Sequence, residues 1–257
     1  MPIDFHDEAQ RLTYAARDAG AAWRHAMRAL LDPAGLRVAD IGCGGGVYCA
    51  AWRDLGAARV VGVDFSAAML SGARERLAGV DGVTLRQGDA CATGLDDASA
   101  DVVFARALVH HLDDLTACFR EAARILAPAG TLIVQDRTLQ DAVRPGSPSH
   151  LRGYFFEAFP RLLDVERARR PSRQAVGDAL ARAGFARVRT RALAEERRTY
   201  DDRAEVRDDL LARTGRSILH ELHDAELARL ADHVTAALPS SGPIHETDHW
   251  TVWAATR

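Results

Sequence analysis

The segment formed by residues 37–64 constrains the fold of this chain more than any other. It starts with an apolar-rich run, Val38–Ile41, and enters a glycine cluster, Gly42–Gly46. A helical pattern follows, and a second apolar run at residues 59–63 ends on Asp64. This order predicts a strand, a tight loop, a helix and a second strand that ends in an acid. It is the layout of a nucleotide-type site in an α/β fold.

The glycines and the acid each suit a bound nucleoside. Gly42, Gly44 and Gly46 have no Cβ and tolerate a positive φ, so the backbone turns sharply and lets a ligand approach closely. The helix that follows offers unpaired N–H groups and the positive end of its dipole to a carboxylate or phosphate. Asp64, at the end of the second strand, suits a ribose because its carboxylate can accept hydrogen bonds from both hydroxyls.

The spacing of the glycines separates two kinds of nucleoside cofactor. The nicotinamide fingerprint G-x-G-x-x-G fails, because Val47 occupies the sixth position from Gly42. The pattern is instead D-x-G-x-G-x-G, with Asp40 inside the first strand, and it resembles motif I of the class I S-adenosylmethionine (SAM) dependent methyltransferases. The resemblance continues, in order, at residues 60–66 with Met69, 85–90, 101–104 and 126–134. It is close over residues 37–138 and holds only in outline elsewhere.

The resemblance implies a doubly wound, seven-stranded α/β Rossmann-like methyltransferase sheet. Residues 1–36 would form an N-terminal cap helix region, and residues 37–257 the SAM-dependent methyltransferase domain. Helical lid insertions are expected at about 138–170 and 195–247, where the chain leaves the carboxyl ends of strands.

The resemblance also assigns the cofactor, SAM, with S-adenosylhomocysteine as its product. The expected cofactor-binding residues are Asp40, Gly42, Cys43, Gly44, Gly46, Asp64, Phe65, Met69, Asp89, Ala90, Ala105 and Tyr14. Two of these have an alternative role: for Asp89 it is the closing of a turn beside Gly88, and for Tyr14 it is packing on its own helix. Trp23, on the same predicted helix, is expected to pack.

Candidate catalytic residues follow the fourth predicted strand, Asp101–Ala105. Ligands bind outside the carboxyl ends of strands in open α/β sheets, which places Arg106, His110 and His111 near the transferred methyl group. A histidine can take a proton from a nucleophile near neutral pH, although either His can equally form a structural hydrogen bond. Asp136, which ends the fifth predicted strand, either orients a substrate or pairs with Arg137.

The sequence disfavours several other chemistries. The segment Phe104–Ala107 lacks the Asn/Asp-Pro-Pro-aromatic motif of base and glutamine methyltransferases, and Ala105 stands where metal-dependent relatives have a ligand Asp. We therefore expect methyl transfer to an O, N or C atom of a small molecule, mainly by proximity and alignment. The alternative is a SAM-binding protein without methyl transfer, in a regulatory or partner role.

One short motif is misleading. His245–His249 reads H-E-x-x-H, the zinc-protease pattern, which needs a helix to bring both histidines to one face. Pro243 precedes the motif and a strand-like run, 250–253, follows it, so a helix has little room here and no metal site is expected. In the predicted lid, the aromatic run Tyr154–Phe159 either lines a pocket or packs the insertion, and Tyr200, Arg216 and His220 are further candidates for substrate contact.

Charge and cysteine content limit the partners. The chain of 257 residues has a formal net charge of −3, which gives no reason to expect a nucleic acid or an anionic membrane as partner. The four cysteines form no C-x-x-C pair, and no signal or membrane-spanning pattern is visible. We expect a cytoplasmic protein, monomeric or homodimeric, that acts on a small molecule.

Overall fold

The structure, a computed structural model, describes residues 18–257. Tyr14 and the first half of the predicted N-terminal helix lie outside the described residues. Within them, the first helix is α1, Ala21–Arg28, which begins after Gly20. Trp23 on this helix is fully buried, and its ring packs edge-on against Tyr48 and Trp52, with centroid distances of 5.0 and 5.2 Å. The expected packing role of Trp23 is therefore confirmed.

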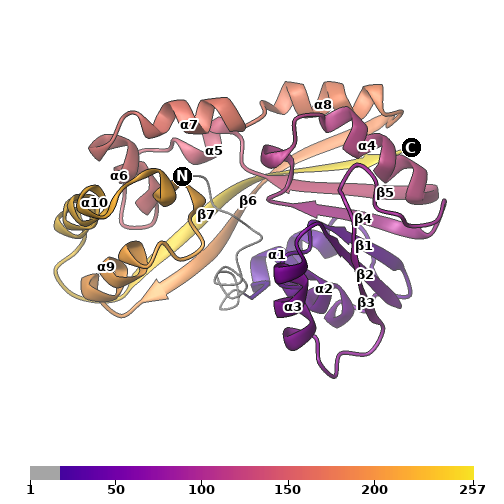
Figure 1. The fold of residues 1–257 in the computed structure, drawn as a ribbon, viewed down its shortest axis with the longest axis horizontal. Coiled ribbons are helices and arrows are strands. Elements are labelled where there is room, and N and C mark those ends of the chain that lie inside the picture. The colour runs from indigo at the N-terminus through magenta and orange to yellow at the C-terminus, as the bar shows by residue number, and fades with distance from the viewer. Residues whose placement is uncertain (1–17) are drawn as a thin grey trace. The chain divides into compact units, whose positions relative to one another are not determined.

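A seven-stranded sheet with the order β3-β2-β1-β4-β5-β7-β6 forms the centre of the fold (Figure 1). Strands β1 to β5 pair in parallel, whereas β7 runs antiparallel to β5. The order reverses at β1, which is the topological switch point where α/β sheets bind ligands. The predicted Rossmann-like methyltransferase sheet is confirmed. The strands are β1 Arg37–Ile41, β2 Arg59–Asp64, β3 Val83–Gln87, β4 Ala100–Arg106, β5 Leu126–Asp136, β6 Arg187–Tyr200 and β7 Ile244–Thr256.

The helices that follow the strands coincide closely with the predicted ones. They begin at side-chain caps where the sequence offers them: Ser66 caps α3 through the amide of Met69, and Ser172 caps α8. The remaining helical elements are short or lie in the predicted insertions. The α-helices after α1 are α2 Val47–Asp54, α3 Ala67–Arg76, α4 Leu115–Ile125, α5 Leu139–Ala142, α6 Leu151–Ala158, α7 Leu162–Arg169, α8 Arg173–Arg182, α9 Arg203–Leu211 and α10 Asp224–Ala237, and the 3-10 helices are η2 Val109–His111 and η3 Ser217–Glu221.

The described chain divides into two compact units. The sheet unit comprises residues 18–136, 171–193 and 250–257, and the helical unit comprises residues 137–170 and 194–249. The helical unit thus consists of the segments in which the sequence predicts insertions.

The sheet unit has an apolar core on each face of its strands. Side chains alternate along a strand, so Val38 on β1 joins the core that contains α1, α2 and α3, while Ala39 joins the core that contains α4 and α8. Figure 1 shows α4 beside α8. The helical unit has a core of its own, and Tyr154, Phe155, Phe156 and Phe159 are all buried in it. The packing interpretation of this aromatic run is therefore the correct one.

The sequence patterns predict strands at residues 131–135, 186–193 and 249–255, and all three strands are longer in the structure. β5 starts at Leu126 instead of Thr131, β6 extends to Tyr200, and β7 starts at Ile244 instead of His249. The extensions of β6 and β7 contain buried charged residues, Glu195 and Glu246 respectively. These charges stand where an alternating pattern requires apolar residues, so the pattern ends before the strand does.

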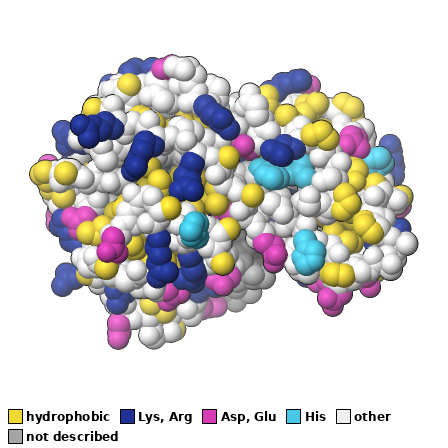
Figure 2. Space-filling model, turned by 180° about the vertical axis from the view of Figure 1, so that it is seen from behind, with side chains coloured by type: hydrophobic (Ala, Val, Ile, Leu, Met, Phe, Trp, Pro, Cys, Tyr) yellow, Lys and Arg dark blue, Asp and Glu magenta, His cyan; other side chains and the backbone are white. Residues whose placement is uncertain are grey.

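Charged side chains on the surface are mixed in sign. Figure 2 shows arginine side chains scattered among acidic, hydrophobic and histidine side chains over the face that it presents. In residues 18–257, no helix combines the length and the apolarity that crossing a membrane requires.

Candidate functional site

The glycine loop joins the end of β1 to the start of α2. The amides of Gly42 and Cys43 donate to the carbonyl of Val63 at the end of β2, with N···O distances of 2.7 and 3.0 Å. These bonds fix the loop across the carboxyl ends of β1 and β2. The loop therefore lies at the edge of the sheet where α/β proteins bind ligands.

Glycine is required in this loop for two reasons. Gly42, Gly44 and Gly46 have φ values of 71°, 51° and 76°, in the left-handed region that other residues rarely adopt. A Cβ on Gly42 would come within 2.9 Å of Leu108 Cδ1, and one on Gly46 within 2.7 Å of Leu77 Cδ1. The three glycines of the motif thus allow a tight turn and close packing at once.

Asp64 ties the glycine loop to the turn after β2. Its Oδ2 accepts from the amide of Gly44 at 2.8 Å, and its Oδ1 accepts from the amide of Ser66 at 2.9 Å. The residue is only 6% exposed. A carboxylate that accepts hydrogen bonds on both oxygens is fixed in orientation, and each oxygen has more than one lone pair. Asp64 is therefore placed to hold a ribose in a set direction.

Asp40 lies beneath the loop in a fully enclosed position. The Cys49 thiol donates to its Oδ2 at 3.3 Å. Burial raises the pKa of Asp40 to about 7, against the hydrogen bond from Cys49 and with a further contribution from the charge of Asp64. The sulfur atoms of Cys43 and Cys49 both lie beside Gly62, because a Cβ added to Gly62 would touch each of them. The Cys43 side chain therefore points into the same core as Cys49. Cys43 can thus meet a ligand through its backbone.

An apolar surface accompanies Asp64. Phe65 is 46% exposed, an unusual state for a large aromatic side chain beside a buried acid. Met69 is buried, and a Cβ on Gly44 would lie 3.3 Å from its Cε, so the thioether packs against the glycine loop. An exposed ring next to a carboxylate suits a nucleoside, whose base is flat and apolar on its faces and whose sugar is polar.

The remaining predicted cofactor residues lie after β3 and on β4. Asp89 is exposed, and its Oδ1 accepts from the amide of Cys91 at 2.7 Å. It therefore closes a turn, as the alternative interpretation states, and its contact with a cofactor stays a prediction. Ala105 is buried in β4, opposite Ile41 on β1.

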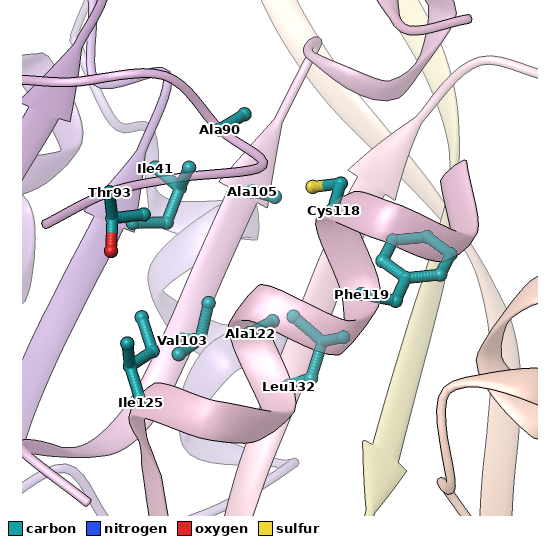
Figure 3. Close-up of a pocket in the computed structure, with 10 residues that line it drawn as sticks. All are labelled: Ile41, Ala90, Thr93, Val103, Ala105, Cys118, Phe119, Ala122, Ile125 and Leu132. Carbon is teal, nitrogen blue, oxygen red and sulfur yellow. The ribbon is translucent and has the colours of Figure 1, made fainter. Parts of the chain in front are cut away.

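A small cavity lies behind these residues in the core between the sheet and α4. Figure 3 shows Ala90 and Ala105 among its lining residues, with Cys118 and Phe119 of α4 on one side. Its volume is about 10 Å³, about the room for one water molecule. It is a packing void, too small for a nucleoside.

A His–Asp pair stands at the carboxyl ends of β4 and β5. His110 Nδ1 lies 2.9 Å from both oxygens of Asp136, and the His110 amide donates to Asp136 Oδ2 at 3.3 Å. Both side chains are buried. The arrangement fixes the imidazole and makes Nε2 the nitrogen that would exchange a proton with a substrate. The expected partner of Asp136, Arg137, pairs with Asp248 instead, at 2.5 Å.

The two other predicted catalytic residues pack beside this pair. The rings of His110 and His111 have their centroids 3.9 Å apart. Arg106 ends β4, and its guanidinium carbon lies 4.4 Å from the centroid of Tyr48 and 4.2 Å from that of Trp250. Arg106 is therefore held between two aromatic rings by cation–π contacts, and its charge lowers the pKa of Asp40 in opposition to burial.

Sequence reasoning did not find the pairing of Asp136 with His110. The signal was present, because both residues follow adjacent strands at their carboxyl ends, but salt-bridging to the neighbouring Arg137 looked more direct. It also missed that Arg216 and Tyr200, considered for substrate contact, are parts of a buried charge network. Tyr200 donates to Glu246 at 2.8 Å, and Arg216 donates to the same carboxylate at 2.6 Å.

The H-E-x-x-H sequence lies on β7 and not on a helix. Glu246 points into the charge network with Arg216, whereas His245 Nδ1 is 2.9 Å from the hydroxyl of Thr199. The motif thus lacks the helical geometry of a zinc protease. Among residues 18–257, no cluster of His, Cys, Asp and Glu has the arrangement of a metal site.

Comparison with known proteins gives a family for the central segment. Residues 39–134 match the family described as methyltransferase domain. Phosphoethanolamine N-methyltransferase 1 of Arabidopsis thaliana is 33% identical over 168 residues, which are 63% of this chain and 30% of that protein. Ubiquinone biosynthesis O-methyltransferase of Chelativorans is 34% identical over 134 residues, 51% of this chain and 52% of that protein. The chain thus spans about half of these relatives or less.

Solved structures share the fold over most of this chain. A putative methyltransferase from an antibiotic biosynthesis pathway of Anabaena variabilis superposes with a TM-score of 0.69 at 21% identity, over 91% of this chain and 96% of that one. A phosphoethanolamine N-methyltransferase 2 of Haemonchus contortus, bound to phosphomonomethylethanolamine and S-adenosylhomocysteine, gives 0.64 at 19% identity, over 99% of this chain and 61% of that one.

The sheet order, the glycine loop and the acid after β2 define a class I, Rossmann-like methyltransferase fold. Together with the family match, they make the central segment, residues 39–134, similar to known methyltransferase domains.

Proposed function

We propose that this protein transfers the methyl group of SAM to a nucleophilic O, N or C atom of a small-molecule acceptor. The observation that carries the proposal is the contact between Gly42 and Leu108: a Cβ on Gly42 would lie 2.9 Å from the Leu108 side chain. Leu108 is two residues before His110. The loop suited to the methyl donor and the pair suited to proton removal are therefore neighbours.

Register along the sheet supports the same proximity. Ile41 at the end of β1 pairs with Ala105 on β4, and Ala105 pairs with Val134 on β5. Neighbouring strands are about 4.8 Å apart. The start of the glycine loop and Asp136 thus lie within roughly two strand spacings of each other, about 10 Å.

The residues around the loop suit the methyl donor. Asp64 would accept from the ribose hydroxyls, and the exposed Phe65 would cover one face of the adenine. Asp40, Gly42, Cys43, Gly44, Gly46 and Met69 form the loop and its support, and Asp89, Ala90 and Ala105 are the further proposed contacts. When bound, SAM supplies an electrophilic methyl group on a positively charged sulfur.

The chain's own part in the reaction is alignment, exclusion of water and proton transfer. His110 would take the proton of an acceptor hydroxyl or amine on Nε2, while Asp136 holds Nδ1 and stabilises the imidazolium. The nucleophile's electron pair then forms the new bond to carbon, and the sulfur–carbon bonding pair stays on sulfur. His111 and Arg106 would position the pair and Asp40 through their stacking contacts.

A SAM-binding protein without methyl transfer is the second candidate. Such a protein would need the glycine loop and Asp64. It would not need a buried carboxylate with both of its oxygens beside an imidazole nitrogen. The His110–Asp136 pair therefore favours an enzyme. We further propose that the helical unit supplies acceptor specificity, as a lid, because its chain begins at Arg137, directly after Asp136.

Location is part of the proposal. The cysteines in the described chain are free thiols, and three of them are buried. Free thiols suit a reducing compartment, so we place the protein in the cytoplasm.

Calorimetric titration with SAM, S-adenosylhomocysteine and NADPH tests the donor site. We expect binding of the first two and not of NADPH. Asp64→Ala should weaken SAM binding by about tenfold to over a hundredfold, because a hydrogen bond to a charged group contributes roughly 1.5 to 3 kcal/mol. The matched control is Asp54→Ala, an exposed acid paired with Arg24 in the same unit. Unchanged SAM affinity in Asp64→Ala would overturn the site assignment.

A further inference from the structure

One buried acid, Glu121, lies on the helix α4 of the sheet unit. Its residue is only 8% exposed. The other buried residues of this helix carry no charge: Cys118, Phe119, Ala122, Ala123 and Ile125. A carboxylate among such neighbours is costly unless hydrogen bonds and an opposite charge satisfy it. Its partners therefore show what the acid does there.

Thr93 and Arg124 satisfy both oxygens of Glu121. Oε1 accepts from the Thr93 amide at 2.8 Å and also from the Thr93 hydroxyl. The Arg124 guanidinium donates to Oε1 and to Oε2, each at 2.8 Å. The hydrogen bonds from Arg124 lower the pKa of Glu121 to about 2 against the effect of burial, and those from Thr93 add to the lowering. Glu121 is therefore a negative charge of fixed orientation at neutral pH.

A turn at residues 89–92 connects the end of β3 to Thr93. At its start, the Gly88 amide donates to the carbonyl of Asp64 at 3.0 Å. At its end, Thr93 passes so close that a Cβ on Gly88 would lie 2.8 Å from the Thr93 carbonyl oxygen. β3 has ended before the turn begins, so its pairing with β2 does not continue through the turn. Glu121, which binds Thr93, therefore anchors the far end of the turn.

Arg124 strengthens this anchor beyond Thr93. Its Nη2 donates to the Leu95 carbonyl at 2.7 Å, and its Nη1 pairs with Asp97. The Leu95 amide in turn donates to the Thr93 hydroxyl at 3.2 Å. The two charged side chains of α4 thus bind the backbone on both sides of Gly94. They hold the segment after the turn as one piece.

Apolar packing beneath the turn is incomplete. The void of about 10 Å³ described above is lined by Ala90 and Thr93 on one side and by Cys118 and Ala122 of α4 on the other (Figure 3). Residues beside a void lose part of their packing contacts, so packing alone leaves the turn room to shift. The hydrogen bonds of Glu121 join the same two elements. They therefore set the position of the turn relative to α4.

The turn carries two of the proposed cofactor contacts, Asp89 and Ala90. Asp89 is exposed, and its Oδ1 accepts from the Cys91 amide, which fixes the carboxylate on the turn. We propose that Glu121, with Arg124, is a positioning residue of the donor site: it holds the turn where Asp89 accepts from the exocyclic amine of a bound adenine. This inference rests on the proposed function, which it deepens by naming the residue that sets the selection of the base.

Hydrogen-bond chemistry explains how a fixed turn selects adenine. The exocyclic amine of adenine donates, whereas hypoxanthine has a carbonyl oxygen in its place, which repels a carboxylate. The ring nitrogen next to that oxygen carries a proton in hypoxanthine. A carboxylate that can shift finds a donor there, but one that is held in place does not. Loosening the turn should therefore reduce the preference for adenine more than it reduces binding in general.

Calorimetric titration of the full chain with two ligands tests this inference. The ligands are S-adenosylhomocysteine and S-inosylhomocysteine, which differ only in the base, adenine against hypoxanthine. We expect the wild-type protein to prefer S-adenosylhomocysteine by about tenfold or more, the effect of one hydrogen bond to a charged group. Glu121→Ala should reduce the preference to less than about threefold. Glu121→Gln keeps an oxygen for the Thr93 amide, so it should retain the preference.

Control variants separate the position of the turn from other effects. Asp64→Ala removes the proposed ribose contact and should weaken both ligands alike, with the preference unchanged. Asp54→Ala, an exposed acid in the same unit, should change neither affinity. If Glu121→Ala fails to fold, Thr93→Val takes its place. It removes the hydroxyl that binds Glu121, and it should lower the preference at least about threefold.

Each outcome of the titrations decides one question. An unchanged preference in Glu121→Ala, or in Thr93→Val where that variant replaces it, overturns the inference. Equal affinities of the wild-type protein for both ligands overturn it as well, because Asp89 then does not recognise the amine. If the wild-type protein binds neither ligand, the donor site itself is wrong, and the proposed function is overturned with it.

Discussion

His110 Nδ1 lies 2.9 Å from each oxygen of Asp136, although 26 positions separate the two residues in the chain. The carboxylate is completely buried and the imidazole nearly so. A carboxylate in this position fixes both the ring orientation and the protonated nitrogen, which leaves Nε2 for the role of base that we propose. Neither residue would be placed for this task without the parallel pairing of β4 and β5.

The His110–Asp136 pair predicts a loss of rate with little loss of donor binding. Once a screen with labelled methyl donor has found an acceptor, His110→Gln should lower kcat by about 10²- to 10⁴-fold, the usual contribution of general-base catalysis. Asp136→Asn should lower it as well, because the imidazole loses its orienting charge. Calorimetry should show S-adenosylhomocysteine affinity within a factor of about three of wild type. His25→Gln, an exposed histidine on α1, is the control, and full activity in His110→Gln would leave proximity as the mechanism.

Gly46→Ala should destabilise the sheet unit, whereas Gly45→Ala should not. Position 46 has a φ of 76°, and a Cβ there would lie 2.7 Å from Leu77 Cδ1. Left-handed backbone costs about 1–2 kcal/mol, and overpacking costs about 1–3 kcal/mol. A Cβ on Gly45 meets nothing within 4 Å. Urea unfolding followed by tryptophan fluorescence checks this, since all four tryptophans are in the sheet unit. Equal stabilities of the two variants would contradict the packing described for the loop.

The raised pKa of Asp40 predicts that the folded protein becomes less stable as the pH rises. Its pKa is about 7 in the folded protein, against an ordinary value of 3.8. Between these values the folded state holds a proton that the unfolded state has released, so the free energy of unfolding decreases from about pH 4 to about pH 7 and then levels off. The shift corresponds to a difference on the order of 4 kcal/mol.

Asp40→Asn removes this titration and isolates its effect. Urea unfolding at several pH values should give a shallower pH dependence for the variant than for wild type between pH 4 and 7. Identical slopes would show that Asp40 is ionised in the folded protein. Asp54→Asn, on the surface of the same unit, provides the comparison.

The charge network of the helical unit predicts a large effect of Arg216→Met. Arg216 is buried and donates to Glu246 at 2.6 Å and to the Tyr200 hydroxyl at 3.1 Å. Removing one partner of a buried ion pair costs roughly 3–5 kcal/mol, because the remaining charge is left buried. Scanning calorimetry should therefore show a much lower transition for the helical unit. Arg207→Met breaks an exposed pair with Asp232 and should cost about 0–1 kcal/mol. A small effect of Arg216→Met would mean that Arg197, which also contacts Glu246, suffices.

The glycine loop and the end of β2 could be predicted from sequence because their determinants are local. The glycine spacing from Gly42 to Gly46 favours left-handed backbone wherever the loop lies, and the structure has positive φ at Gly42, Gly44 and Gly46. Asp64 follows an apolar run, and it ends β2 in the structure. The hydrogen bond from the Gly44 amide to Asp64 was not predicted, and the contact of these residues with a methyl donor stays a prediction.

The rest could not be predicted because it depends on contacts between distant segments. Asp136 finds its partner through strand pairing, and Glu246 meets Arg216 across 30 positions of the chain. The end of β6 and the start of β7 could not be predicted either. A strand whose inward residues include Glu195 or Glu246 does not alternate in hydrophobicity.

The separate core of the helical unit has a consequence for how this protein changes over generations. Substitutions around Leu219, Leu227 or Leu230 alter the packing of that unit alone, while the glycine loop depends on contacts within the sheet unit. The sequence of the helical unit can therefore change during evolution without changes in the sheet unit. On the proposed function, the choice of acceptor can then change while the use of the methyl donor is inherited unchanged.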